Sequence, residues 1–204
     1  MLRNNLLNTP LGFVLKFLAL SLYLLAFTCP AFASKEDLSL IDGLENPYPA
    51  PLLMGITSWM NSKPIKLSEL SNKVILVEFW TSSCPYCRNA LPHVNSWYKR
   101  YHNRGFLVIG IHSPKNEEEK GQVIVKEAID RYAIHYPVAL DNNFETWDNY
   151  RVEGWPSFYL IDRSGNVVYA TRGAQDYEIM ENNIRFLLNL DEDGSKPMSE
   201  AKRD

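Results

Sequence analysis

The sequence predicts an α/β domain in which a central mixed β-sheet is flanked by helices. Two nearly continuous apolar runs rich in β-branched residues, Lys73–Trp80 and Gly105–His112, are typical of strands buried on both faces of a sheet. A segment with helical spacing of apolar residues follows each run, and two further strands joined by a short turn come later. This alternation of strands and helices indicates one sheet covered on both faces.

The N-terminus has the pattern of a secretory signal peptide. Arg3 and Lys16 supply positive charge, Phe17–Phe27 is apolar, and Ala31–Ala33 offers the small residues that a signal peptidase needs. We therefore expect residues 1–33 to be removed and the protein to be periplasmic or secreted. The alternative is a membrane anchor formed by residues 11–28 that leaves the domain facing the periplasm, because this stretch approaches the ~20 residues of a membrane span.

Cleavage would change the charge and the cysteine content of the chain. The mature protein would carry 19 basic and 24 acidic side chains, a net charge of −5, which argues against a nucleic-acid binder. It would also lose Cys29 and keep only Cys84 and Cys87. One close pair in an oxidising compartment does not make a disulfide-dense scaffold, so the pair needs another explanation.

Residues 34–54 are polar and rich in proline and are expected to form a lead-in to a domain that spans residues 55–190. A short N-terminal hairpin extension followed by a turn of helix is expected within Trp59–Leu70. After the first central strand, a helix is expected from Pro85 to about Asn103. Its apolar side chains recur at helical spacing: Leu91, Val94, Trp97, Tyr98 and Tyr101.

The second half of the chain predicts an inserted αβ element, a hairpin and a terminal helix. The insertion combines a helix within Glu117–Ile134 with the short strand Tyr136–Leu140. Strands at Pro156–Asp162 and Val167–Gly173 flank a turn, and Tyr177–Leu190 is helical. The apolar face of the inserted helix is expected to comprise Val123, Ile124, Ile129 and Tyr132. Residues 191–204 are charged and are expected to form a disordered tail.

Cys84 and Cys87 are placed where the first central strand meets a helix. Residues three apart lie on one face of a helix, so the two can close a small disulfide. Pro85 suits the first helical position, where its missing N–H has no partner to lose. The free amides and the dipole at the helix N-terminus favour a thiolate at Cys84. We expect Cys84 to be the exposed nucleophile and Cys87 the resolving thiol one turn deeper.

Three other roles for the Cys84–Cys87 pair are disfavoured by the sequence, and one stays open. Structural zinc needs four ligands, and no two of the four histidines form the second closely spaced pair that would complete such a site. An inert disulfide would close a ring too small to remove much chain entropy. A peroxidase is disfavoured because no proline precedes the "TSSC" segment as that chemistry requires. A copper metallochaperone or thiol sensor stays open, because thiolates suit Cu(I). The redox role requires no metal and no organic cofactor.

Two segments carry a resemblance to a known family. "VILVEFWTSSCPYCRNALPHV" resembles the active-site segment of thioredoxin-like proteins, in which an apolar strand leads to CxxC at a helix start and a proline, here Pro92, follows. "GWPSFYLIDRSGNVVY" resembles the second landmark, a cis-proline before a strand and hairpin. "VIGIHSPK" and "YPVALDNNFETWDNY" are most similar to the exported TlpA/DipZ-like branch. The resemblance implies a thioredoxin fold over residues 55–190 and thiol–disulfide exchange with protein cysteines.

The resemblance also implies roles for particular residues. Glu78 matches a buried acid that lies beneath the second cysteine and moves its proton, and burial should raise the pKa of Glu78 toward neutrality. The alternative is that Glu78 points to solvent or pairs with Lys73. Pro156, after Trp155, matches the cis-proline. The substrate-binding groove is expected to comprise Trp80, Pro85, Tyr86, Trp155 and Pro156.

The family pattern is not matched everywhere. Ser83 stands where thioredoxin usually has tryptophan, and the dipeptide Pro85-Tyr86 resembles that of glutaredoxins. If this dipeptide sets the redox potential of the cysteine pair, we expect a potential of about −200 to −230 mV. The implied partners are cysteine-containing proteins and a membrane thiol reductant that recharges a monomeric protein.

Overall fold

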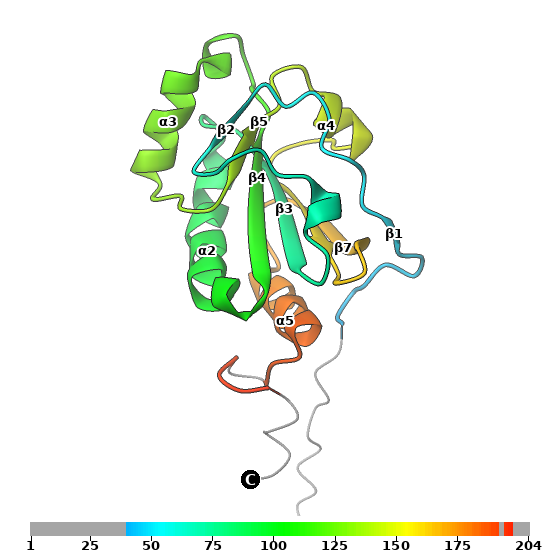
Figure 1. Cartoon of the computed structure of the whole chain (residues 1–204). Helices are drawn as coiled ribbons and strands as arrows, with labels where there is room; N and C mark the ends of the chain where they lie inside the picture. Colours follow the sequence, from blue (N-terminus) through cyan, green and yellow to red (C-terminus); the bar gives the residue numbers. More distant parts are fainter. Residues whose placement is uncertain (1–39, 192–193, 198–204) are drawn as a thin grey trace, which may run out of the picture. The chain divides into compact units, whose positions relative to one another are not determined.

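A mixed sheet of seven strands forms the centre of the computed structural model, which describes residues 40–191 and 194–197 (Figure 1). The predicted signal segment therefore lies outside the described residues. The strand order is β1-β7-β6-β3-β4-β5-β2. The strands are β1 (Tyr48–Pro49), β2 (Ser58–Met60), β3 (Val74–Trp80), β4 (Phe106–His112), β5 (Val138–Leu140), β6 (Ser157–Ile161) and β7 (Asn166–Arg172).

The central strand of this order is β3, which explains its continuous apolar sequence. It pairs in parallel with β4 and antiparallel with β6, and all seven of its residues are buried. Strand β5 extends the parallel part of the sheet next to β4, whereas β7 pairs antiparallel with β6. The predicted α/β class with a mixed sheet is confirmed.

Helices cover both faces of the sheet (Figure 1). Side chains of α2, α3 and α5 pack on the face that carries Leu76 and Trp80, while α4 and the segment before β3 cover the face that carries Val77 and Phe79. The α-helices are α2 (Pro85–Tyr101), α3 (Gln122–Arg131), α4 (Glu145–Asn149) and α5 (Tyr177–Leu188). The 3₁₀ turns are η1 (Leu67–Glu69), η2 (His102–Arg104) and η3 (Glu118–Lys120).

The expected N-terminal hairpin is wrong. Strand β2 pairs antiparallel with β5 at one edge of the sheet, and β1 pairs with β7 at the opposite edge. The first two strands are therefore the opposite edge strands of the sheet, and their short length limits pairing with another chain. The described part of the lead-in is also held to the domain, since the Ala50 N–H donates to the Gly165 carbonyl at 2.9 Å.

The apolar face expected for the inserted helix is partly wrong. Helix α3 buries Val125, Ala128 and Ile129, whereas Val123 is 70% exposed and Ile124 41% exposed. The helix begins only at Gln122, so Val123 and Ile124 lie in its first turn and face away from the sheet. The two exposed apolar residues follow directly on η3, a 3₁₀ turn that approaches the cysteine segment.

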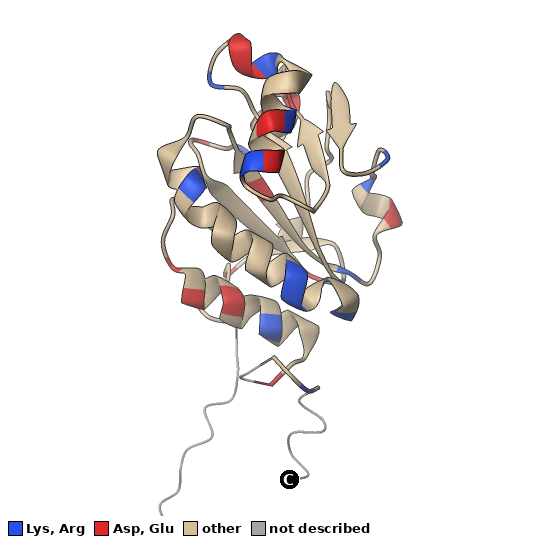
Figure 2. Ribbon diagram, turned by 90° about the vertical axis from the view of Figure 1, so that its left-hand side faces the viewer, with Lys and Arg blue, Asp and Glu red and all other residues tan. Residues whose placement is uncertain are grey.

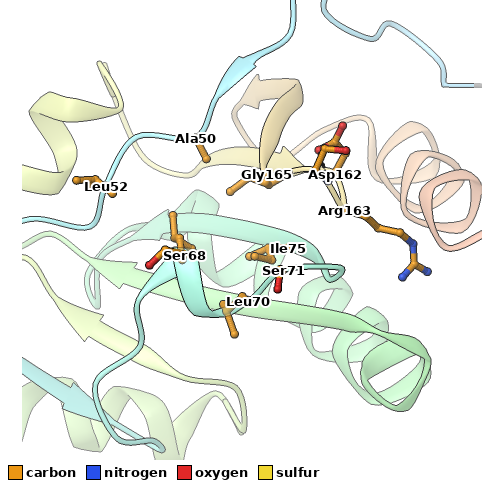
Figure 3. Close-up of a pocket in the computed structure, with 12 residues that line it drawn as sticks. Ala50, Leu52, Ser68, Leu70, Ser71, Ile75, Asp162, Arg163 and Gly165 are labelled. Carbon is orange, nitrogen blue, oxygen red and sulfur yellow. Dashed lines mark hydrogen bonds between the residues drawn. The ribbon is translucent and has the colours of Figure 1, made fainter.

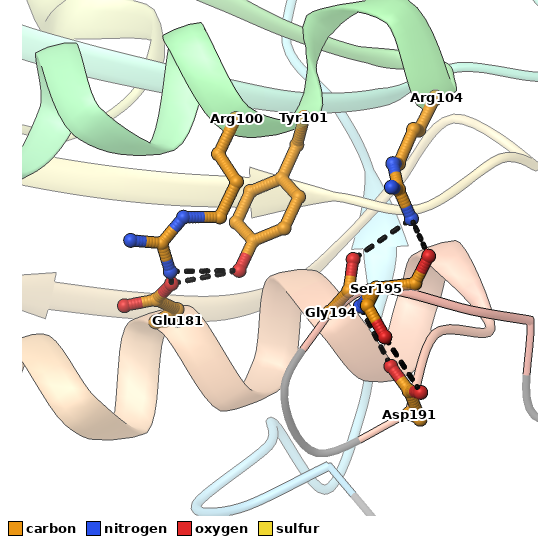
Figure 4. Close-up of polar contacts among 7 residues, drawn as sticks. All are labelled: Arg100, Tyr101, Arg104, Glu181, Asp191, Gly194 and Ser195. Carbon is orange, nitrogen blue, oxygen red and sulfur yellow. Dashed lines mark hydrogen bonds and ion pairs between the residues drawn. The ribbon is translucent and has the colours of Figure 1, made fainter.

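Helices α2 and α5 are joined by polar contacts, shown in Figure 4. The Tyr101 hydroxyl donates to Glu181 Oε1 at 2.7 Å, and Arg100 forms an ion pair with the same carboxylate. Arg104 donates to the carbonyls of Gly194 and Ser195 at 2.8 and 3.0 Å. These hydrogen bonds tie Gly194 and Ser195 to η2, which directly follows α2.

Charge is mixed over the side of the molecule that carries the helices. Figure 2 shows both basic and acidic positions on α3 and α5 and basic positions on α2. Acidic residues therefore accompany the basic ones on two of these three helices, in contrast to the one-sided basic faces of nucleic-acid-binding domains. Within the described residues, no helix combines the length and the apolar character needed to cross a bilayer.

Candidate active site

The ends of three central strands, β3, β4 and β6, lie next to one another where β3 leads into α2. The sheet register sets Trp80 of β3 beside His112 of β4. On the other side of β3, Ser157 lies opposite Phe79, so the register brings Pro156 next to the end of β3. In open α/β sheets, sites form at such carboxyl ends of strands. Cys84 follows β3 at this end of the central strands, and the Trp155–Pro156 peptide bond is cis.

Cys84 is the N-cap residue of α2. Its backbone is extended, with φ −74° and ψ 116°, and Pro85 occupies the first turn of the helix. The Cys87 N–H donates to Cys84 Sγ at 3.2 Å, so an otherwise unpaired helix amide is directed at the sulfur. This amide and the helix dipole favour the negative charge of a thiolate. The sulfur is less open than expected, since Cys84 is only 7% exposed.

Cys87 lies one turn into α2 and has no exposed surface. Burial is the main cause that raises the pKa of this thiol far above its ordinary value, and the adjacent Cys84 sulfur and the carboxylate of Glu78 raise it further. Cys87 is therefore held as a neutral thiol. It becomes a nucleophile only if a nearby group takes its proton.

The charge of Glu78 acts on the Cys87 thiol, and the Glu78 side chain is fully buried within β3. Burial raises the pKa of Glu78 to about 7, and a hydrogen bond from Tyr136 opposes this rise. The Tyr136 hydroxyl donates to Glu78 Oε2 at 2.8 Å, and Oε1 has no hydrogen-bond partner among the described residues. The expected alternatives, a solvent-facing side chain or a pair with Lys73, are wrong because Glu78 points into the core.

The residues expected to line a substrate groove differ in exposure. Tyr86 is 65% exposed next to Cys84, and Pro85 is also exposed. Trp155 is half-buried, and its ring packs in a tilted arrangement against Trp147, with ring centroids 4.7 Å apart. Trp80 has no exposed surface, so in this structure it supports the site from within the core and cannot contact a substrate.

Sequence reasoning missed Glu119, a buried residue of η3 that holds the segment before Cys84. Its carboxylate accepts hydrogen bonds from the Thr81 hydroxyl, from the Ser83 N–H at 3.1 Å and from the Lys115 N–H at 2.7 Å. Burial alone would raise the pKa of Glu119, but these hydrogen bonds outweigh it and lower the pKa to about 2. Glu119 lies in a run of three glutamates, and no local pattern distinguishes the buried one from its neighbours.

His112 also supports this segment. The Ser82 N–H donates to His112 Nε2 at 3.3 Å, which requires the neutral ring to accept at that nitrogen. Burial lowers the pKa of His112 to about 4, although the negative charge of Glu119 acts in the opposite direction. Among the described residues, no group of three or more histidine, cysteine or acidic side chains gathers to hold a metal ion.

The sequence profile of the Redoxin family matches residues 50–188. The chain belongs to the Redoxin family. Protein DipZ of Mycobacterium tuberculosis is 45% identical over 156 residues, which are 75% of this chain and 22% of DipZ. This chain therefore spans about a fifth of the length of that relative. Thiol-disulfide oxidoreductase YkuV of Bacillus subtilis is 26% identical over 140 residues, which are 69% of this chain and 94% of YkuV.

Solved structures agree with this membership. A thiol-disulfide isomerase from Corynebacterium glutamicum superposes with a TM-score of 0.63 at 30% identity, over 70% of this chain and 98% of that one. A thioredoxin-like protein in its oxidised form gives a TM-score of 0.65 at 25% identity, over 71% of this chain and 97% of that one. This Redoxin family member thus shares its fold with proteins named for thiol–disulfide chemistry.

A pocket of about 260 Å³ lies elsewhere in the molecule. It is lined by residues of η1, by Ala50 and Leu52, and by the turn between β6 and β7 (Figure 3). Ile75 and Ile161 line it as well, and these lie at the beginning of β3 and the end of β6. The pocket is therefore at the opposite end of β3 from Cys84 and does not belong to the cysteine site.

Proposed function

We propose that this protein is an exported thiol–disulfide oxidoreductase that uses Cys84 and Cys87 as a redox pair and protein cysteines as substrates. The observation that carries the proposal is the contact between the Cys87 N–H and Cys84 Sγ at the start of α2. It puts the two cysteines within reach of each other and directs a helix amide at one sulfur. The names of the relatives YkuV and the Corynebacterium isomerase support the same chemistry.

The reaction begins with the Cys84 thiolate, which attacks one sulfur of a substrate disulfide. A Cys84–substrate disulfide forms, and the other substrate sulfur leaves as a thiolate that takes a proton from water. Cys87 then loses its proton to Glu78, and its thiolate attacks Cys84 Sγ. The Cys84–Cys87 disulfide forms and the second substrate thiolate leaves. Two electrons pass from the protein dithiol to the substrate, and the reverse sequence oxidises a substrate dithiol.

The exposed surface beside Cys84 is proposed to receive the substrate chain. Pro85 and Tyr86 offer exposed apolar surface at the helix start, and the half-buried Trp155 and the buried Pro156 are proposed to form the opposite wall at the neighbouring strand end. Apolar and aromatic side chains with a few directed polar groups are typical of such sites. Because Cys84 is itself only slightly exposed, this groove would restrict access to extended segments that can reach the sulfur.

The exported location rests on the N-terminal sequence pattern. Residues 1–33 are proposed as a cleaved signal peptide, with a membrane anchor over residues 11–28 as the alternative. In either case the domain faces an oxidising compartment, where a membrane thiol reductant would return Cys84 and Cys87 to the dithiol state. N-terminal sequencing of the protein purified from its native host distinguishes the two, because cleavage gives a chain that begins at Ser34.

A trapping experiment tests the proposed function. Cys87→Ser removes the resolving thiol, so we expect a disulfide between Cys84 and substrate proteins to accumulate in the native compartment and to disappear on reduction. Cys84→Ser is the matched control and should trap nothing. The absence of any Cys84-dependent adduct would contradict the oxidoreductase role. Titration of the reduced protein with Cu(I) covers the rival: tight binding of one ion by a protein that reduces no disulfide would favour copper handling.

A further inference from the structure

Among the residues that the structure describes, the Glu78 carboxylate has one hydrogen-bond partner, and it comes from far along the chain. Its Oε2 accepts the hydrogen bond from Tyr136, whose side chain has no exposed surface. Tyr136 directly precedes the short strand β5 and belongs to the inserted αβ element between β4 and β6. The insertion therefore supplies the partner of the one carboxylate in the central strand.

The space that Tyr136 occupies exists because residue 110 is a glycine. Gly110 lies directly opposite Glu78 in the β3–β4 register. A Cβ atom built at Gly110 would stand 3.1 Å from Tyr136 Cε2 and 3.1 Å from Trp80 Nε1, closer than ordinary van der Waals contact. A side chain at this position would displace one of the two rings. The glycine thus allows the phenol ring to pass over β4 and reach the carboxylate.

The backbone and ring of Tyr136 are fixed by further contacts. Asn61 Nδ2 donates to the Tyr136 carbonyl at 3.1 Å, and the Gly110 N–H donates to the carbonyl of Pro137 at 2.9 Å. The ring of Tyr98 on α2 packs edgewise on the Tyr136 ring, with centroids 5.7 Å apart. The hydroxyl is therefore held toward Glu78 by contacts on several sides.

We propose that Tyr136 is a positioning residue for thiol–disulfide exchange: its hydroxyl orients Glu78 and favours the carboxylate form that accepts the proton of Cys87. This inference rests on the proposed function. The titratable groups that interact with Glu78 are Tyr136, Cys87 on α2 and Tyr177 on α5. Its neighbours in the sheet, Gly110 and Phe158, carry no titratable group.

Loss of the Tyr136 hydroxyl should change the pKa of Glu78 in a definite direction. The hydrogen bond lowers the pKa of Glu78 against the effect of burial, so Tyr136→Phe should raise that pKa above about 7. If it rises by about one, the ionised fraction of Glu78 at pH 7 falls about fivefold. Fewer molecules can then take the Cys87 proton, and the resolving step slows by the same factor. Above the new midpoint Glu78 is ionised again and the rate recovers.

Reaction of the reduced protein with the aromatic disulfide 5,5′-dithiobis(2-nitrobenzoate) separates the two steps. Attack by Cys84 releases one thionitrobenzoate and leaves a mixed disulfide, and attack by Cys87 releases the second. Tyr136→Phe should leave the first phase unchanged, slow the second about fivefold at pH 7 and move its pH midpoint upward. Tyr150→Phe is the matched control, because its buried hydroxyl has no hydrogen-bond partner among the described residues and lies in the other core cluster.

The outcomes separate the inference from the proposed function. A second phase that is unchanged in Tyr136→Phe, or slowed equally at every pH, would overturn the positioning role. If the wild-type protein releases only one thionitrobenzoate, the redox pair itself is contradicted. Glu78→Gln provides a second route should the phenylalanine variant fail to fold: its second phase should be slow and should have no midpoint near pH 7. Retention of that midpoint would also overturn the inference.

Discussion

Replacing Glu119 by glutamine is expected to destabilise the protein by about 3 kcal/mol at pH 7. The carboxylate accepts three hydrogen bonds, from the Thr81 hydroxyl and from the backbone N–H groups of Ser83 and Lys115. A glutamine of the same size has one oxygen and one NH₂ group. In either orientation the NH₂ group faces at least one donor, so at least one of the three donors loses its partner.

The magnitude follows from the ionisation of Glu119. Its pKa lies at about 2 in the folded protein, against an ordinary value of 4.5. At about 1.4 kcal/mol for each pKa unit, this difference is worth about 3 kcal/mol of stability. Because the folded pKa is depressed, the stabilisation is complete above about pH 4.5 and is lost as the pH falls toward 2. At pH 3 about half of it should remain.

Guanidinium chloride unfolding followed by tryptophan fluorescence measures the effect at pH 7 and at pH 3. We expect Glu119→Gln to lower the unfolding free energy at pH 7 and to differ less from the wild type at pH 3. Glu118→Gln changes the same residue type one position earlier on the exposed side of η3 and should have little effect. Equal stability of Glu119→Gln and the wild type at pH 7, or a difference that does not shrink with acid, would refute the reasoning.

Three further outcomes are expected. Glu78 has a folded pKa of about 7, above its ordinary 4.5, so its contribution to stability is full below about pH 4.5 and is lost as the pH rises through 7. The unfolding free energy of the wild type should therefore fall by up to about 3 kcal/mol between pH 5 and pH 8. Denaturant unfolding of Glu78→Gln at the two pH values should not show this decline. Gly110→Ala should cost about 1–3 kcal/mol in thermal unfolding because its Cβ would stand 3.1 Å from two rings, whereas Gly154→Ala, whose Cβ meets nothing closer than 3.5 Å, should cost less. Arg104→Ala should destabilise by about 1 kcal/mol through lost hydrogen bonds to the tail, and equal loss in the exposed control Lys99→Ala would contradict this.

Local sequence patterns were sufficient to place the cysteine pair. The apolar run of β3 identified a strand buried on both faces, and Pro85 after Cys84 marked the first turn of α2. These features depend on neighbours within one or two turns of chain, where spacing and backbone preference act directly. The burial of Glu78 was expected from the resemblance to thioredoxin-like proteins, while the strand pattern alone left a solvent-facing side chain open.

The partners of these residues were decided by the tertiary structure. Tyr136 reaches Glu78 across 58 positions of sequence, and Glu119 reaches Thr81 across 38. No periodicity links residues so far apart, and three consecutive glutamates look alike until the fold buries one of them. The pairings of β1 and β2 likewise depended on which strands, here β7 and β5, had one side without a partner. The sequence by itself thus determined the spacing of the cysteine pair and its place at a helix start. Only the fold decided which distant side chains hold and tune it, because hydrogen bonds and burial act through space.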